Sequence, residues 1–219
     1  MTADNVVVVT ITSMSPATSE AARDGGSEKA RATRAALIKS ACDFFVEDGY
    51  GAVSVRDLAR RTKLTSGAIY GHFRNKADLL VAAIGEKLVT ELEVPQRGRN
   101  LELPDYLAAQ ARQYRSRAAL RALIVEGAAA ARVDDDVKER LGALQAAKLD
   151  EWRAIYRELQ RSEHMDTAAD MDTLVVFLWA AEVGLGVLEA IDVPLPKPSA
   201  WARLIERVVR AATTGSKSP

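Results

Sequence analysis

The chain has 219 residues, of which 48% are hydrophobic and 27% are charged, and its formal net charge at pH 7 is zero. This composition is typical of a globular protein with a core of ordinary size, and no uninterrupted apolar run approaches the ~20 residues that span a bilayer. We therefore expect no membrane partner. A single cysteine excludes an internal disulfide framework.

The charge is unevenly distributed along the chain. Residues 29–88 contain eleven Lys and Arg against six Asp and Glu, so this segment carries +5 and the remainder carries −5. A basic segment attracts the phosphates of DNA, and because salt screens this attraction, the affinity for DNA should fall steeply as the salt concentration rises. The distribution indicates a DNA-facing N-terminal part on an acidic body.

The N-terminal part begins with an arm and a long helix. Residues 1–28 hold a valine-rich stretch and then a Ser, Thr and Gly-rich run, which predicts a flexible arm; Met14 is an alternative translation start. Residues 28–48 predict a helix that ends at Gly49, because glycine adopts the left-handed cap at little cost. Cys42 lies on the apolar face of this helix, which favours a buried packing thiol over the alternative, a redox sensor.

Two short helices with a tight turn follow. Ser54 with Asp57 three residues later, and then Thr65, are N-cap signals. Asn75, with Asp78 at the third position, predicts the start of another helix. A short helix with small polar residues in its first turn, backed by an arginine-rich helix, suits entry into the DNA major groove, which is about 12 Å wide.

Three groups within residues 31–84 together resemble the DNA-binding domain of the TetR family of bacterial transcriptional regulators: 41–50, 54–59, and 69–73 with Lys76, Leu79 and Leu80. The resemblance implies an all-α protein of about nine helices, with a three-helix DNA-binding head, a linking helix and a divergent body that dimerises and binds a small effector. By position, it implies DNA contacts at Ser54, Arg56, Thr65, Ser66, Gly67, Tyr70, His72 and Lys76. Ser54 and Lys76 resemble phosphate contacts. Many relatives have an aromatic residue where this chain has Gly71.

Each aromatic or histidine in this motif also has a plainer interpretation. Phe73 is interpreted as a core residue, whereas Tyr70 is expected to present its hydroxyl outward. His72 is a solvated surface residue if it does not contact DNA.

The chain therefore divides into an arm (1–28), a DNA-binding head (29–76), an effector-binding and dimerisation body (77–213) and a flexible tail (214–219). Helices are predicted to start near 77, 104, 134, 170 and 199, and a further helix is predicted through residues 119–131. The triplet Asp134-Asp135-Asp136 is interpreted as a helix start and not as a metal site, because no second ligand cluster accompanies it. We expect no metal and no cofactor.

An apolar stripe at helical spacing runs along residues 134–162 and is interrupted by Lys148. This interruption suggests an effector pocket in which Lys148 is the charged anchor and Trp152, Tyr156 and Phe177 are the lining, which would favour an amphipathic ligand with an acidic or polar end. The alternative is a lysine that sends its charge to solvent, or that pairs with a carboxylate such as Glu182.

The helix predicted over 170–190 is apolar on nearly every side, so we expect a second subunit to cover it, together with the last helix. Small residues such as Gly184 and Gly186 would let a partner backbone approach, unless they pack within one chain. The expected interface residues are Ala181, Gly184, Leu185, Leu188, Leu204 and Val208.

The leading hypothesis is a dimeric repressor of the bacterial cytoplasm, associated with the nucleoid and released from a palindromic operator by a small apolar or amphipathic effector. A transcriptional activator and a ligand-independent DNA-bridging protein are alternatives with the same fold. A helical enzyme is disfavoured, because the chain has two histidines, one cysteine, no Gly-rich phosphate loop and no recognisable nucleophile–base pattern.

Overall fold

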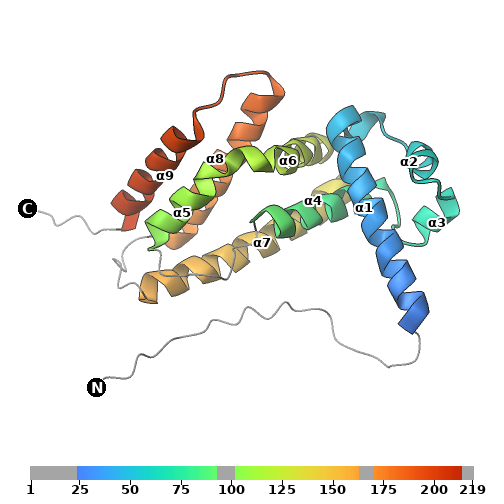
Figure 1. Ribbon diagram of the computed structural model, residues 1–219, viewed down its shortest axis with the longest axis horizontal. Helices are drawn as coiled ribbons and strands as arrows, with labels where there is room; N and C mark the ends of the chain where they lie inside the picture. Colours follow the sequence, from blue (N-terminus) through green and yellow to red (C-terminus); the bar gives the residue numbers. More distant parts are fainter. Residues whose placement is uncertain (1–23, 93–101, 163–169, 214–219) are drawn as a thin grey trace, which may run out of the picture.

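The computed structural model describes residues 24–92, 102–162 and 170–213, and no strand occurs within these ranges (Figure 1). The expected all-α fold is confirmed. The flexible arm, the start at Met14 and the flexible tail concern residues that lie wholly or mostly outside the described ones. The helices are α1 (Asp24–Ala52), α2 (Val55–Thr62), α3 (Ser66–Tyr70), α4 (Lys76–Leu92), α5 (Leu103–Arg112), the short 3₁₀ helix η1 (Tyr114–Arg117), α6 (Ala118–Ala130), α7 (Asp135–Ser162), α8 (Met171–Ala190) and α9 (Pro198–Thr213).

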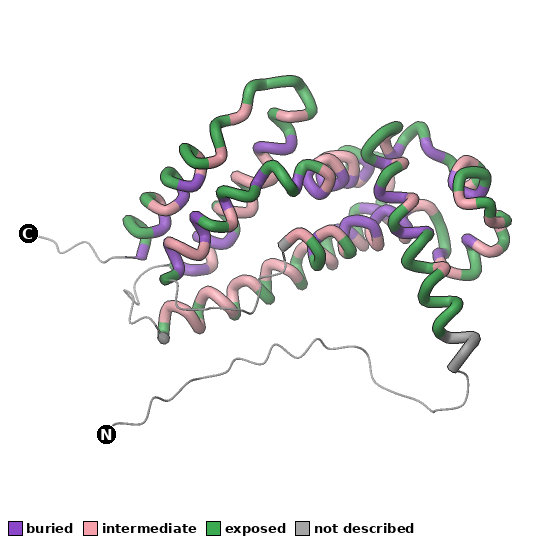
Figure 2. Tube along the Cα trace, viewed as in Figure 1, coloured by how far each residue is buried: buried purple, intermediate pink, exposed green. Residues whose placement is uncertain are grey.

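Helices α1, α2 and α3 form a head at one end of the molecule, and α5, α8 and α9 lie toward the opposite end (Figure 1). Helix α4 leads from the head into the body, where α4, α6 and α7 pack on one another. Buried positions follow the sides on which neighbouring helices meet, while the outer sides are exposed (Figure 2). The head is therefore joined to the body through packed helices.

The helix starts have the physical causes expected from the sequence. Ser54 and Asp57 form a capping box, in which Ser54 Oγ accepts from the Asp57 N–H at 3.2 Å and Asp57 Oδ2 accepts from the Ser54 N–H at 3.2 Å. Thr65 caps α3, and Asn75 Oδ1 accepts from the Asp78 N–H at 2.8 Å at the start of α4. These caps fix where the short helices begin, because they satisfy N–H groups that have no partner within the helix.

The first helix differs from its prediction at both ends. It begins at Asp24, and Gly49, with φ 78°, is a kink after which one more helical turn follows. Only glycine takes this backbone conformation without strain, so Gly49 does redirect the chain. The helical turn continues beyond it because the Tyr50 N–H donates to Glu126 Oε2 at 2.8 Å, a contact from α6 that the local sequence does not reveal.

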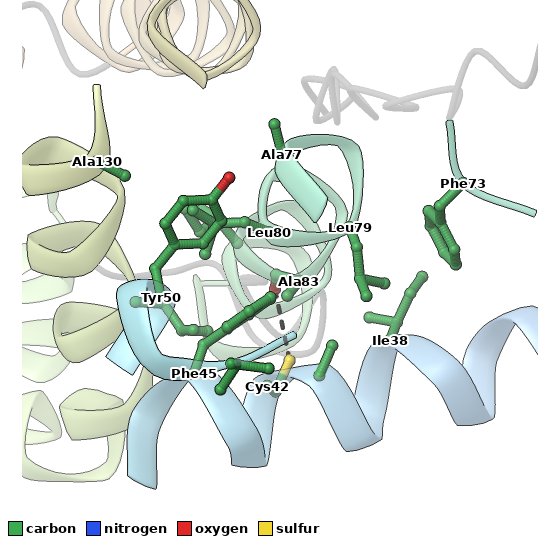
Figure 3. Packing of buried hydrophobic residues seen from close by; sticks show 14 of the residues in the cluster. Ile38, Cys42, Phe45, Tyr50, Phe73, Ala77, Leu79, Leu80, Ala83 and Ala130 are labelled. Carbon is green, nitrogen blue, oxygen red and sulfur yellow. Dashed lines mark hydrogen bonds between the residues drawn. The ribbon is translucent and has the colours of Figure 1, made fainter. Parts of the chain in front are cut away.

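One apolar core extends from the head into the near half of the body. Figure 3 shows Ile38, Cys42 and Phe45 of α1 packed against Leu79, Leu80 and Ala83 of α4. Phe73 is 2% exposed, so its interpretation as a core residue is confirmed. Cys42 Sγ donates to the Ala83 carbonyl at 3.7 Å, and burial raises the pKa of its thiol to about 11.

A second core closes the far end, where α5 packs on α9 and Met171 and Leu174 of α8 join them. Helix α8 is also, among the described residues, the one helix long and apolar enough to cross a membrane by length and composition. It packs instead against α6 and α7, and Glu182 in its middle is ion-paired. These contacts cover part of its apolar surface, whereas Val176, Phe177, Val187 and Leu188 stay exposed.

Candidate nucleic-acid interface

The outer surface of α2 and α3 carries the residues that the sequence predicted to face DNA. Arg56 and Gly67 are exposed, and Tyr70 is 54% exposed. Ser54 and Thr65 are exposed at the two N-caps, whereas Ser66 and His72 are partly buried. Leu58, Ala59 and Ile69 turn inward and hold these two helices on the head core. Five of the eight predicted residues, Ser54, Arg56, Thr65, Gly67 and Tyr70, are thus exposed in the structure.

Charge pairing sets the orientation of α2. Arg61 lies over the Phe44 ring at 4.3 Å and binds Glu47 of α1 at 2.9 Å, while Arg60 pairs with Asp57 at 2.7 Å. Hydrogen bonds from Ser54 hold the pKa of the Asp57 carboxyl below its usual value. Arg56 has no charged partner among the described residues. It is therefore the arginine of α2 that remains available to a phosphate or a base edge.

Lys76 is placed differently from the other predicted contacts. Its ammonium donates to the carbonyls of Tyr50 at 2.8 Å and Val53 at 3.1 Å, and it lies 4.1 Å from the Tyr50 ring centroid. Burial lowers the pKa of this lysine. Its phosphate contact stays a prediction, and in the free protein Lys76 ties the start of α4 to the turn between α1 and α2.

Acidic side chains of the body hold the base of the head. Glu126 accepts from the Tyr50 N–H, and Asp134 accepts from the Tyr50 hydroxyl at 3.3 Å. Burial and the Asp134 charge raise the pKa of Tyr50 to about 12. Asn75 donates to Asp136 at 2.6 Å. Asp134 also caps α7, which agrees with reading the triplet as a helix start, and the same cluster orients the head on the body.

The predicted effector residues do not all meet. Trp152 packs on Trp179 with ring centroids 5.2 Å apart, and Tyr156 joins the second core, where burial raises its pKa. Phe177 is 47% exposed. Lys148 is 16% exposed and its Nζ lies 2.7 Å from Glu151, one turn along α7. This contact agrees with the alternative in which Lys148 pairs with a carboxylate of the body, but the carboxylate is Glu151 and not Glu182.

Glu182 is held by two buried arginines that sequence reasoning did not single out. Arg117 donates twice to Glu182 at 3.0 Å, and Arg121 lies 3.0 Å from Glu182 and 2.6 Å from Glu189. Arg117 and Arg121 are 3% and 1% exposed. Their spacing of four residues, facing two glutamates seven residues apart, was the signal available in the sequence.

The predicted interface residues on α8 and α9 fall into two groups. Leu204 is 51% and Leu188 38% exposed, and a Cβ on Gly184 would meet open space. Leu185 is 4% exposed, so it lies in the chain's own core. A Cβ on Gly186 would lie 2.9 Å from Arg121 Cβ, so this glycine admits α6 of the same chain. Ala181 and Val208 are partly buried.

Comparison with known sequences gives a match over the head. Residues 37–83 match the family model described as bacterial regulatory proteins, tetR family. The HTH-type transcriptional repressor Rv3405c of Mycobacterium tuberculosis is 43% identical over 58 residues, which cover 26% of this chain and 30% of that relative. The 58 residues matched to Rv3405c thus span less than a third of that relative.

Comparison with solved structures extends over the body. A putative TetR-family transcriptional regulator from Rhodococcus sp. superposes with a TM-score of 0.69 at 17% identity, over 83% of this chain and 98% of that one. FadR from Bacillus subtilis, solved in complex with stearoyl-CoA, superposes with a TM-score of 0.64 at 16% identity, over 81% of this chain and 98% of that one. At these identities the likeness shows a shared all-α fold.

Proposed function

Because the chain belongs to the tetR family of bacterial regulatory proteins, we propose that it is a transcriptional repressor that binds a palindromic operator as a homodimer and is released by a small effector. The observation that carries this proposal is the outer face of α2 and α3. There Arg56, Thr65 and Tyr70 are exposed on two capped helices that pack on an apolar core. A short helix held in this way fits the major groove.

The proposal that the chain represses transcription, and does not activate it, is based on its similarity to Rv3405c. Rv3405c is described as a repressor, and its similarity covers 26% of this chain. A repressor needs only to occupy its site, which a dimeric head of this kind does without further contacts. Repression is therefore the simplest regulatory outcome for this chain.

The dimer is supported by the exposed apolar side chains of α8 and the segment that follows it. Val187 is 48%, Ile191 65% and Val193 39% exposed, and Leu188 and Leu204 extend the same group. Apolar surface of this kind on a soluble helical body marks an interaction site. A two-fold pairing through α8 and α9 would cover it and set the spacing of the two heads.

Response to an effector is supported by the interior of the body. The structural neighbour FadR was solved in complex with stearoyl-CoA. In this chain the region between α7 and α8 combines a tryptophan pair with polar side chains, which suits a ligand with a large apolar part. An apolar or amphipathic molecule is the effector class that fits these residues.

The test is selection of genomic DNA fragments bound by the purified chain, followed by titration of the enriched sequence. We expect an inverted repeat bound by two chains, with affinity that falls steeply as salt rises. Recovery of fragments without a shared sequence would contradict the proposal. Transcription from a promoter that carries the repeat then separates a repressor from an activator.

A further inference from the structure

We propose that the side-chain amide of Gln145 is the recognition group of an interior ligand site between α4, α6, α7 and α8. We infer that this site takes a neutral, largely aromatic ligand with one group that both donates and accepts a hydrogen bond, such as a phenol or a carboxamide. The inference rests on the proposed function, because it names the chemistry of the effector.

The first step is the state of the amide itself. Gln145 Nε2 and Oε1 are both buried, and neither has a hydrogen-bond partner among the residues that the structure describes. A glutamine amide offers two donors and an acceptor with two lone pairs, and buried groups of this kind are almost always bonded. Gln145 thus combines a donor and an acceptor that a ligand can satisfy together.

Other buried polar atoms without a partner do not share this property. Glu91 Oε2, Arg121 Nη2 and Arg153 Nε also lack hydrogen bonds among the described residues. Each belongs to a side chain that is already ion-paired: Glu91 with Lys87 at 2.8 Å, Arg121 with Glu189 at 2.6 Å and Arg153 with Asp150 at 2.7 Å. Gln145 differs because its whole polar group has no partner within the described ranges.

Gln145 is partly buried and lies on a part of α7 whose neighbouring residues pack on other helices. Leu141, one turn before it, reaches Gly127 of α6, where a Cβ would lie 2.9 Å from Leu141 Cδ2. Its neighbour Leu144 faces Gly85 of α4 in the same way, at 3.8 Å. Two turns further on, Trp152 packs on Trp179 of α8. Gln145 and Trp152 are seven residues apart, so they share one side of α7.

The charges around this position explain why the ligand should be neutral. Lys148 is paired with Glu151, and Glu182 is paired with Arg117 and Arg121. An anion would have to displace Glu151 from Lys148, so a carboxylate gains little there. The two tryptophan rings offer apolar and π surface. The hydrogen-bonding groups that a ligand would still have to satisfy are the amide donor and acceptor of Gln145.

The experiment compares three probes with one ring system: 2-naphthol, naphthalene and 2-naphthoate, each measured by equilibrium dialysis with the full chain. We expect 2-naphthol to bind about tenfold more tightly than naphthalene, since it satisfies a buried hydrogen-bonding group, and 2-naphthoate to bind no better than naphthalene. In Gln145→Leu the preference for 2-naphthol should disappear. Lys148→Met should keep it.

Three outcomes would overturn the inference: no probe binds, Gln145→Leu keeps the preference, or 2-naphthoate binds best and loses its affinity in Lys148→Met. The last outcome would assign the anchor to Lys148. Operator binding without probe, measured on the same variants, separates this inference from the proposed function. A wild-type chain that selects an inverted repeat but fails the probe test keeps its function and loses the Gln145 site.

Thermal unfolding of the ligand-free protein gives a second readout. Gln145→Leu should raise the midpoint by about 2–4 °C, because it removes an unpaired buried amide. Gln110→Leu is the matched control, since Gln110 Nε2 donates to the Tyr106 hydroxyl at 3.5 Å. That substitution should not raise the midpoint. A lower midpoint for Gln145→Leu would show that its amide is already bonded and would overturn the inference.

Discussion

The head and the body of this protein treat buried polar groups in opposite ways. In the head, the core contributed by α1, α2 and α3 is apolar. Its cap hydrogen bonds are made at the surface, by the side chains of Ser54, Thr65 and Asn75. In the body, Arg117 and Arg121 are buried, and the amide N and O of Gln145 are buried without a partner in the part of the chain that the structure describes.

This difference indicates where each part acts. A DNA-binding head presents its chemistry outward, so its interior needs only to be rigid. Buried polar groups cost stability unless they are bonded, so a body that retains them has either a structural network or an interior ligand to satisfy them. The arginine network fits the first case and Gln145 fits the second.

The largest expected effect comes from breaking the arginine network of the body. Arg121→Met leaves Glu189 without its arginine and Glu182 with only one, and such a loss costs about 3–5 kcal/mol in the free energy of unfolding. Denaturant unfolding measures it. Arg132, which is exposed in the turn after α6 and has no ion pair among the described residues, gives the control Arg132→Met, expected within about 0.5 kcal/mol of wild type. Equal effects of the two substitutions would show that the network does not hold α6 to α8.

The second prediction concerns Cys42, which lies in the apolar core of the head. Burial raises the pKa of its thiol from 9.0 to about 11, so at pH 8 the native protein holds about 100-fold less thiolate than a thiol with the unshifted pKa. A disulfide reagent should modify Cys42 at least that much more slowly in native than in urea-unfolded protein. Comparable rates would mean that the head core opens readily, and would revive the redox-sensor alternative.

The outward chemistry of the head is tested on its exposed side chains. Arg56→Ala and Tyr70→Ala should each weaken operator binding more than about tenfold, a loss of about 1.4 kcal/mol. The thermal midpoint should stay unchanged, because Arg56 is exposed and Tyr70 is 54% exposed. Titrations of labelled operator provide the measurement. If both variants bind like wild type, α2 and α3 do not carry the DNA-facing surface.

Lys76 gives the smallest and sharpest test, because the family resemblance and the structure assign it different partners. Loss of one phosphate contact lowers the slope of log affinity against log salt by about 0.9. We expect Lys76→Met to lower the thermal midpoint and leave this slope unchanged, since its ammonium bonds the Tyr50 and Val53 carbonyls. A reduced slope with an unchanged midpoint would restore the phosphate contact.

The sequence predicted the head more completely than the body for a physical reason. Ser54, Thr65 and Asn75 act on residues within four positions, so their caps can be recognised from spacing alone. The contacts that were missed join distant segments: Glu126 with Tyr50, and Arg121 with Glu182 and Glu189. The same holds for Lys148. Helical spacing placed it on the apolar face of its helix, but spacing did not reveal which carboxylate it would pair with.

The most direct test of the central claim, that two identical heads read two inverted half-sites, is the dependence of affinity on half-site spacing. The operator selected from genomic DNA is compared with a copy in which ~5 base pairs, half a helical turn, are inserted between its halves. The account predicts that the insertion lowers affinity to the level of unrelated DNA, because the two half-sites then face opposite sides of the duplex. Equal affinity for both DNAs would contradict it.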